Sequence, residues 1–171
     1  MQIWRRCRPM DRVASDADFM TCAIREAERA FKKGEVPVGA VLVINNGIIA
    51  RSFNKKEAAF DPTAHAEISV LKSGAGAIRN WRLSEATLYV TKEPCIMCAG
   101  AMVNARLGRL VYGCRDSKGG GVDSLYHLLS DKRLNHQVAV VSGVMDEECA
   151  ILLKQFFHAR RPKPTLQPSK L

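Results

Sequence analysis

The spacing of apolar residues along the chain predicts alternating helices and strands. Ser15, followed three residues later by Asp18, is typical of a helix start, and apolar residues then recur with helical spacing until the helix ends near Gly34. Two β-rich runs, residues 38–44 and 48–53, are separated by Asn-Asn-Gly, which tolerates the positive φ of a hairpin turn. The first part of the chain is therefore expected to form one helix and an antiparallel hairpin.

The rest of the chain alternates between the two kinds of element. We expect helices near residues 63–79, 95–105, 123–129 and 146–159, and strands at 87–91, 109–112 and 138–141. Strands separated by helices favour right-handed crossovers and parallel pairing, so the hairpin and the later strands should share one sheet. The predicted fold class is α/β, a three-layer α/β/α arrangement with a five-stranded mixed sheet between helical layers.

Length and charge add little to this picture. A chain of 171 residues suits one domain with a real core, and the periodic region places that domain at residues 15–161. Residues 1–14 are basic and residues 162–171 are Pro-rich, and neither segment is periodic, so both are expected to be disordered. The formal net charge is +9, of which residues 1–14 contribute +3 and residues 159–171 contribute +4. Charge alone therefore does not establish a nucleic-acid partner.

The distribution of apolar residues and cysteines indicates a cellular setting. No apolar run approaches the roughly 18 residues that a membrane-spanning helix needs, and the N-terminal residues do not form a signal peptide. We therefore expect a cytoplasmic protein with no membrane association and with reduced thiols. The six cysteines are scattered except for one Cys-x-x-Cys, so a disulfide framework is not expected.

Two predicted helix starts carry residue types that bind metals. In the first, Asp61 or Thr63 is expected to be the N-cap, which places His65 and Glu67 in the first turn. Residues two apart lie about 200° around a helix. Both side chains can therefore reach one centre only where the end of the helix points at it.

The second helix start is the Cys-x-x-Cys. A proline precedes Cys95 and Cys98, which share a face, and the partial positive charge of a helix N-terminus favours thiolates. Two thiolates and the His65 imidazole suit Zn²⁺, and three protein ligands leave the fourth position open to water, as in catalytic sites. A fourth ligand, such as Cys114 or His136, would instead make the site structural, and this alternative stays open.

The pairing of His65-Ala66-Glu67 with Pro94-Cys95-Ile96-Met97-Cys98 resembles the signature of the cytidine deaminase superfamily. More narrowly, the segments 34–40, 61–67, 115–118 and 135–136 resemble the bacterial tRNA-specific adenosine deaminases, which convert the wobble adenosine of a tRNA anticodon to inosine. The likeness runs from about residue 18 to residue 161. It implies the cytidine deaminase-like fold, one Zn²⁺ per subunit, and hydrolysis by a zinc-bound hydroxide.

The resemblance also implies roles for residues around the metal. Glu67 is expected to be the proton shuttle, near the metal but not bound to it. Asn54 would bind the purine edge, the Ala66 backbone would help to hold the base, and Val36 would form part of the pocket wall. Read from the sequence alone, Asn54 is equally well a turn residue at the end of a strand.

Further residues are expected to contact the RNA. By resemblance, two groups would do so: Asn135 and His136 near the ribose, and Asp116, Lys118, Phe157 and Arg161 on the anticodon stem-loop. Two subunits would form the RNA-binding surface, so we expect a homodimer. Without the resemblance, Phe157 is equally well a core residue and Lys118 a solvated loop charge. Lys92 and the glycine run at 119–121 depart from the family pattern, so contacts to the anticodon loop are expected to differ here.

Two other functions remain open at this point. The metal site alone does not choose the base, so one alternative is a deaminase of a free base, nucleoside or nucleotide, such as cytosine, cytidine, deoxycytidylate or guanine. The segments flanking the metal site favour RNA, because an enzyme that flips a base out of a loop recovers the cost through additional contacts. The second alternative is a non-catalytic RNA-binding module stabilised by zinc.

Overall fold

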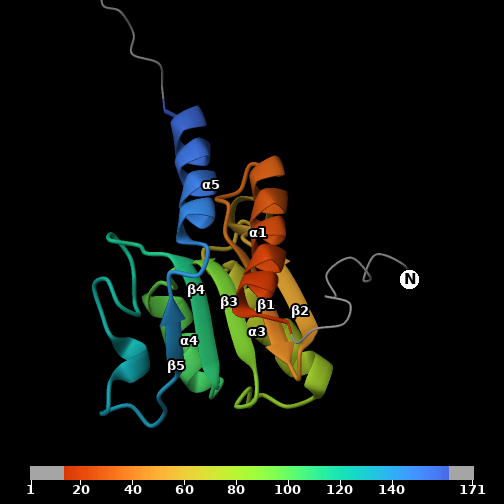
Figure 1. Ribbon diagram of the computed structural model, residues 1–171, viewed down its shortest axis with the longest axis vertical. Helices are drawn as coiled ribbons and strands as arrows, with labels where there is room; N and C mark the ends of the chain where they lie inside the picture. Colours follow the sequence, from red (N-terminus) through yellow and green to blue (C-terminus); the bar gives the residue numbers. More distant parts are fainter. Residues whose placement is uncertain (1–13, 162–171) are drawn as a thin grey trace, which may run out of the picture.

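A five-stranded mixed sheet forms the centre of the molecule, for which a computed structural model describes residues 14–161 (Figure 1). The strands are β1 (Gly39–Ile44), β2 (Gly47–Phe53), β3 (Thr87–Lys92), β4 (Arg109–Cys114) and β5 (Ala139–Ser142). Their order is β2-β1-β3-β4-β5; β1 is antiparallel to both β2 and β3, whereas β3, β4 and β5 are mutually parallel neighbours. The predicted mixed sheet is confirmed.

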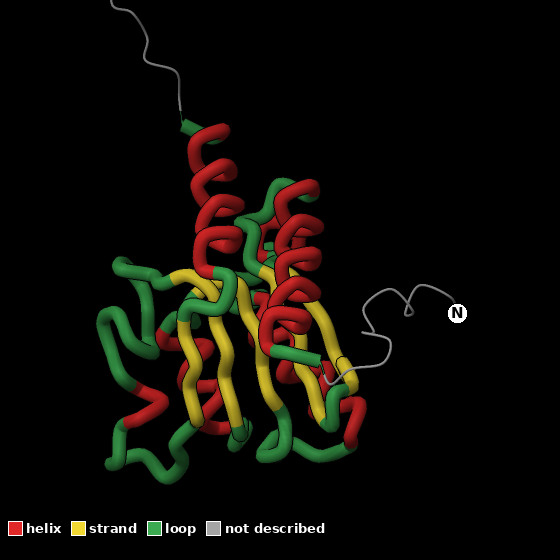
Figure 2. The backbone as a smooth tube through the Cα atoms, in the orientation of Figure 1, coloured by secondary structure: helices red, strands yellow, loops and turns green. Residues whose placement is uncertain are grey.

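Helices cover both faces of this sheet. They are α1 (Asp16–Lys32), α2 (Lys56–Ala59), α3 (Ala66–Ile78), α4 (Ile96–Asn104) and α5 (Asp146–Ala159), with a 3₁₀ turn η2 (Leu128–Ser130). Helices α1 and α5 pack on one face, and α3 and α4 on the other. Figure 2 shows the strands as one layer between these helices, with α5 extending beyond the end of the sheet. The predicted three-layer α/β/α class is confirmed.

Alternation along β1 explains why the sheet has a core on each side. Successive side chains of a strand point to opposite faces. Ala40 and Leu42 join the cluster under α3 and α4, whereas Val41 and Val43 join the cluster under α1 and α5. All four are buried, which is typical of a strand covered by helices on both faces.

The local signals at the start of the chain are confirmed in detail. Ser15 is the N-cap of α1, where its hydroxyl accepts a hydrogen bond from the Asp18 amide at 3.3 Å. The Ser15 amide donates to the Asp18 carboxylate at 2.8 Å, which completes the capping box. Asn45 and Asn46 both adopt positive φ, as the tight turn between β1 and β2 requires.

The prediction for the start of α3 was wrong about the N-cap and about His65, which was expected in the first turn. The expected cap Asp61 accepts hydrogen bonds from the amide and hydroxyl of Thr63, both at 2.7 Å, and so forms a turn before the helix. The helix itself begins at Ala66, which makes His65 the N-cap, in an extended conformation. Glu67 lies in the first turn, as predicted.

Three further differences concern short elements. The helix expected over 95–105 begins one residue later, so that Cys95 is the N-cap of α4. Where a helix over 123–129 was predicted, the chain forms turns followed by the 3₁₀ turn η2, and the backbone amides of residues 122–124 bind a buried carboxylate from another segment. The four-residue helix α2 was not predicted.

Two sequence predictions concern membranes and the chain ends. Within residues 14–161, no helix is both long enough and apolar enough to cross a bilayer. The segments predicted to be disordered lie outside the described residues, apart from Ala14. That residue packs against the core under α1 and α5.

Candidate metal centre and active-site cleft

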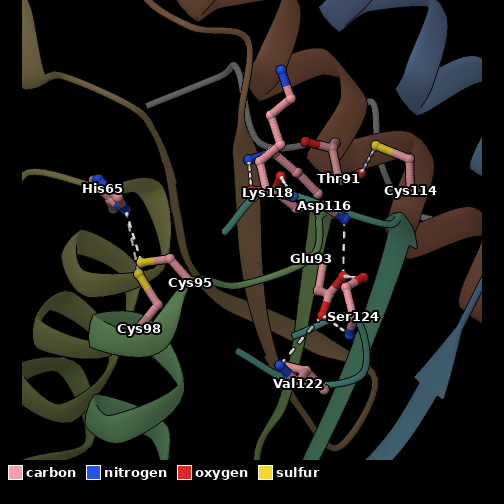
Figure 3. A network of polar contacts seen from close by, with 11 residues as sticks. His65, Thr91, Glu93, Cys95, Cys98, Cys114, Asp116, Lys118, Val122 and Ser124 are labelled. Atoms are coloured by element: carbon pink, nitrogen blue, oxygen red, sulfur yellow. Dashed lines mark hydrogen bonds and ion pairs between the residues drawn. The ribbon is translucent and has the colours of Figure 1, made fainter. Parts of the chain in front are cut away.

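Three side chains that can bind a metal converge where the N-termini of α3 and α4 meet. His65 and Cys95 are the N-caps of these helices, and Cys98 lies in the first turn of α4. The His65 Nδ1 atom lies 3.7 Å from Cys95 Sγ and 3.5 Å from Cys98 Sγ (Figure 3). All three ligand atoms lie within 4.8 Å of one another, which confirms that the residues predicted from the two helix starts come together.

The two thiols of this cluster are hydrogen-bonded to each other and differ in pKa. Hydrogen bonding from Cys98, aided by His65, lowers the pKa of Cys95 to about 3 despite its burial. The hydrogen bond to Cys95, together with burial and the charge of Glu67, raises the pKa of Cys98. A divalent cation would stabilise both thiolates, and two thiolates with one imidazole form a donor set that suits Zn²⁺.

Glu67 lies beside this cluster and is not a member of it. Its side chain is 4% exposed, and among residues 14–161 no hydrogen-bond partner is found for Oε2. Burial raises the pKa of Glu67 above the ordinary value for a glutamate. A buried carboxyl that has one oxygen without a hydrogen-bond partner and a raised pKa is suited to accept and release protons.

Neither candidate for a fourth ligand joins the cluster. The Cys114 thiol hydrogen bonds to the Thr91 carbonyl at 3.5 Å and packs in the core under α1 and α5, on the opposite face of the sheet from α3 and α4. The His136 Nε2 atom lies 2.7 Å from the Leu107 carbonyl oxygen. Within the described residues, the ligand set therefore consists of one imidazole and two thiols.

A cleft of about 240 Å³ opens onto the cluster. Its walls come from several elements that are far apart in the sequence, and they include Val36, Val38, Asn54, Lys56, His65, Glu67, Lys92, Glu93, Cys95 and Phe157. The structure thus places Val36 and Asn54, predicted to contact the base, in the cleft beside the His-Cys-Cys cluster, and it also places there Phe157, which was predicted to contact the anticodon stem-loop. Ala66, between His65 and Glu67, is fully buried as the first residue of α3.

The predicted RNA-contact residues Asp116 and Lys118 lie on the loop that follows β4. The Asp116 carboxylate forms an ion pair with Lys92, which explains how the chain accommodates a lysine at that position. Burial opposes ionisation of Asp116, but the Lys92 ammonium outweighs it and lowers the pKa of the carboxyl. Lys118 is exposed, and its backbone amide donates to Asp116 at 3.1 Å.

Asn135 and His136 are not brought to this cleft. Asn135 accepts a hydrogen bond from Arg106, and His136 contacts Leu107. Both contacts are with the loop that leads into β4, whereas Cys95 follows the carboxyl end of β3. Because β3 and β4 are parallel, these two places lie at opposite ends of the sheet. Arg161, near the end of the described chain, is exposed.

Two buried carboxylates beside the cleft were not predicted from the sequence. Glu35 is 1% exposed and Glu93 is 2% exposed. Burial acts to raise the pKa of Glu93, but hydrogen bonds from Asp116 and Ser124 outweigh it and lower the value to about 2. The only available signal was a glutamate next to Pro94 in the Glu-Pro-Cys sequence, since the partners of both carboxylates are distant in sequence.

Comparisons with known proteins agree with this geometry. A family model for MafB19-like deaminases matches residues 14–161. The tRNA-specific adenosine deaminase of Bacillus subtilis (strain 168) is 50% identical over 151 residues, which cover 88% of this chain and 94% of that protein. This chain belongs to the tRNA-specific adenosine deaminases. A second member of that family, from Haemophilus influenzae, is 45% identical over 157 residues, or 91% of each chain.

Solved structures support both the family and the fold. One from work on A-to-I editing by tRNA:A34 deaminases at the wobble position of transfer RNA superimposes with a TM-score of 0.76 and 46% identity, covering 79% of this chain and 98% of that one. A guanine deaminase from Nitrosomonas europaea gives a TM-score of 0.73 at 19% identity, covering 91% and 92%, and shows the shared fold alone. The cytidine deaminase-like fold expected for a tRNA-specific adenosine deaminase is confirmed.

Proposed function

We propose that this protein hydrolyses adenosine to inosine at the wobble position of a tRNA anticodon. The observation that carries the proposal is the cleft in which a His-Cys-Cys cluster lies beside a buried, unligated glutamate. Relatives that are 41–50% identical over most of the chain and named tRNA-specific adenosine deaminases support adenosine in tRNA as the substrate.

The chemistry divides between a metal and one carboxyl group. His65, Cys95 and Cys98 would hold one zinc ion per subunit, which would supply the Lewis acidity that lowers the pKa of water. Glu67 takes a proton from the attacking water at its free Oε2 and delivers it to a ring nitrogen of adenine. It then takes the proton of the hydroxyl now bonded to the ring carbon and delivers it to the departing amino group, as the carbonyl of inosine forms. One water is consumed, ammonia leaves, and the carboxylate returns to its starting state.

The walls of the cleft position the base for this proton transfer. Asn54, whose side chain is buried in the cleft wall, would recognise the purine edge, with Val36 beside it and the Ala66 backbone holding the base. A small site of this kind, apolar with a few placed polar groups, suits a flipped-out nucleobase.

Contacts to the anticodon stem-loop would come from the rim. We assign them to Asp116 and Lys118 on the loop after β4, and to Phe157 and Arg161 at the end of α5. A ribose contact by Asn135 and His136 would require a second subunit to bring them to the cleft, which agrees with the proposed homodimer. We also propose a cytoplasmic location, in keeping with the five free cysteines among residues 14–161.

One assay tests the substrate assignment. The purified, zinc-loaded protein is given an anticodon stem-loop with adenosine at the wobble position, and inosine is measured by mass spectrometry. Control substrates are the same stem-loop with that adenosine moved elsewhere in the loop, free adenosine, and free cytidine. We expect inosine from the first substrate and a far lower kcat/KM for the others. Equal turnover of the free nucleosides would reject the tRNA substrate, and binding of the stem-loop without turnover would favour a non-catalytic module.

A further inference from the structure

Glu93 anchors the loop after β4 through hydrogen bonds to its backbone and to one side chain. Its Oε1 accepts hydrogen bonds from the backbone amides of Val122 at 3.3 Å, Asp123 at 2.8 Å and Ser124 at 2.9 Å. Its Oε2 accepts from the Asp116 amide at 2.9 Å and from the Ser124 hydroxyl (Figure 3). One buried side chain therefore holds both ends of the loop formed by residues 115–124.

The same segment also carries a metal-binding cysteine. Glu93 is followed directly by Pro94 and Cys95, the N-cap of α4. The Gly121 amide donates to the Pro94 carbonyl at 2.8 Å, and Gly120 forms an antiparallel bridge with Cys95. The loop and the metal-ligand turn, residues 94–98, thus share backbone hydrogen bonds as well as the Glu93 carboxylate.

Close packing at this junction explains two residues of the glycine run. A Cβ atom on Gly120 would lie closer than 3.0 Å to the Glu93 carboxylate. A Cβ atom on Gly121 would lie 2.8 Å from the amide nitrogen of Ile96 and 2.9 Å from the carbonyl carbon of Cys95. A side chain at either position would push the loop away from the metal-ligand turn.

We propose that Glu93 is a positioning residue that couples the metal-ligand turn to loop 115–124, so that metal binding orders the side of the loop that carries Asp116 and Lys118. The coupling itself depends only on the contacts described above, whereas its consequence for catalysis rests on the proposed function. By thermodynamic linkage the effect is reciprocal: if metal binding orders the loop, then ordering the loop raises the affinity for the metal.

Glu93→Gln is the first test because it preserves shape and removes one acceptor. The amide oxygen of a glutamine can still accept from residues 122–124. Its NH₂ group would then face the Asp116 amide, and two donors cannot bond, so this end of the loop is released selectively. Gly120→Ala displaces the carboxylate without changing any charge. Gly76→Ala on α3 is the matched control, since a Cβ there meets nothing within 4 Å.

The primary readout is amide hydrogen exchange with and without Zn²⁺, which needs no substrate. In the wild type and in Gly76→Ala, we expect zinc to slow exchange at Asp116 by about tenfold or more. In Glu93→Gln and Gly120→Ala, zinc should change that exchange less than about twofold, while amides in β3 keep their protection. The same zinc-dependent slowing in all four proteins would overturn the proposal.

The kinetic readout separates positioning from general damage. With the wobble-adenosine stem-loop, Glu93→Gln and Gly120→Ala should each raise KM about tenfold, while kcat stays within about threefold of the wild-type value. An equal loss of kcat and zinc content with KM unchanged would contradict a positioning role. If the wild type shows zinc-dependent protection but makes no inosine, the proposed function fails and the coupling stands. If inosine forms but zinc leaves the loop amides unchanged, the coupling fails and the proposed function stands.

Discussion

The side-chain amide of Asn54 donates a hydrogen bond to the carboxylate of Glu35 at 3.2 Å, in the wall of the cleft. The same carboxylate accepts hydrogen bonds from the backbone amides of Glu57 at 3.2 Å and Ala58 at 2.8 Å, in the first turn of α2. Glu35 thus fixes the orientation of Asn54 and the position of the segment that follows it. Glu35, which is not among the residues that line the cleft, thus sets the geometry of one that is proposed to bind the base.

Glu35→Ala is therefore expected to affect both stability and substrate binding. Two backbone amides and the Asn54 side chain lose their acceptor, so the free energy of unfolding should fall by about 1–3 kcal/mol, as measured by urea denaturation. The kcat/KM for the stem-loop should fall at least about tenfold, mainly through KM. Glu57→Ala, at an exposed position on α2, is the control and should change neither quantity. Unchanged kcat/KM in Glu35→Ala would show that the orientation of Asn54 does not matter.

Glu67→Gln should abolish turnover and leave the metal bound. Because Glu67 lies outside the ligand set, zinc content measured by mass spectrometry should match the wild type. Loss of the proton-carrying carboxyl should lower kcat by about 10²–10⁴-fold. His65→Ala, which removes a ligand, should lose zinc as well as activity. Turnover near the wild-type level in Glu67→Gln would require another group to move the protons.

Local signals account for the parts of the fold that the sequence predicts well. The Ser15–Asp18 capping box and the Asn45–Asn46 turn need only neighbouring residues. The spacing of apolar and β-branched residues then predicts where the strands lie. The His-Cys-Cys group could also be predicted, because ligand identity and spacing restrict which helix starts can meet.

Contacts between distant segments could not be predicted in the same way. Glu93 binds amides 23 to 31 residues away, and Glu35 binds partners 19 to 23 residues away. Nothing in the spacing of these residues indicates such pairing. The Asp61 carboxylate accepts its hydrogen bond from Thr63 within a turn and does not cap the helix, so α3 begins later than predicted. Local preference identified the type of residue but not its partner.

The ion pair between Asp16 and Arg109 should make stability depend on pH in the acid range. Two Arg109 nitrogens lie 2.8 and 2.7 Å from the Asp16 carboxylate oxygens, and the Tyr89 hydroxyl donates at 2.9 Å, joining α1 to β3 and β4. The hydrogen bond with Arg109 is the main cause that lowers the pKa of Asp16 in the folded protein. A lowered pKa means that the stabilisation is present above about pH 4 and is lost as pH falls through the folded value.

Asp16→Asn tests this directly. The pair is about one-third exposed, so solvent screening limits the expected loss at pH 7 to about 1 kcal/mol in the free energy of unfolding. The difference between wild type and variant should shrink as the pH falls from 4 toward 2. Glu28→Gln, at an exposed position on the same helix, is the control and should have no measurable effect at any pH. A constant difference between Asp16→Asn and the wild type from pH 7 to pH 2 would show that the carboxylate charge is not responsible.

Lys118 and Lys92 should differ in their effect on the salt dependence of RNA binding. The Lys118 side chain has no acidic partner within 4 Å in the described part of the chain, whereas Lys92 is already paired with Asp116. Counterion release depends on the number of phosphates that the protein neutralises. If Lys118 meets a phosphate of the stem-loop, Lys118→Gln should reduce the slope of log Kd against log salt concentration by about 0.7–0.9.

The matched control replaces the neutral Lys92–Asp116 pair with another neutral pair. The double variant Lys92→Met/Asp116→Asn keeps the net charge, so the salt slope should stay at the wild-type value even if the affinity changes. Fluorescence anisotropy with a labelled stem-loop, measured from about 50 to 200 mM salt, gives both slopes. An unchanged slope in Lys118→Gln would exclude a phosphate contact by Lys118. A reduced slope in the double variant would instead indicate that Lys92 leaves Asp116 to neutralise a phosphate when RNA binds.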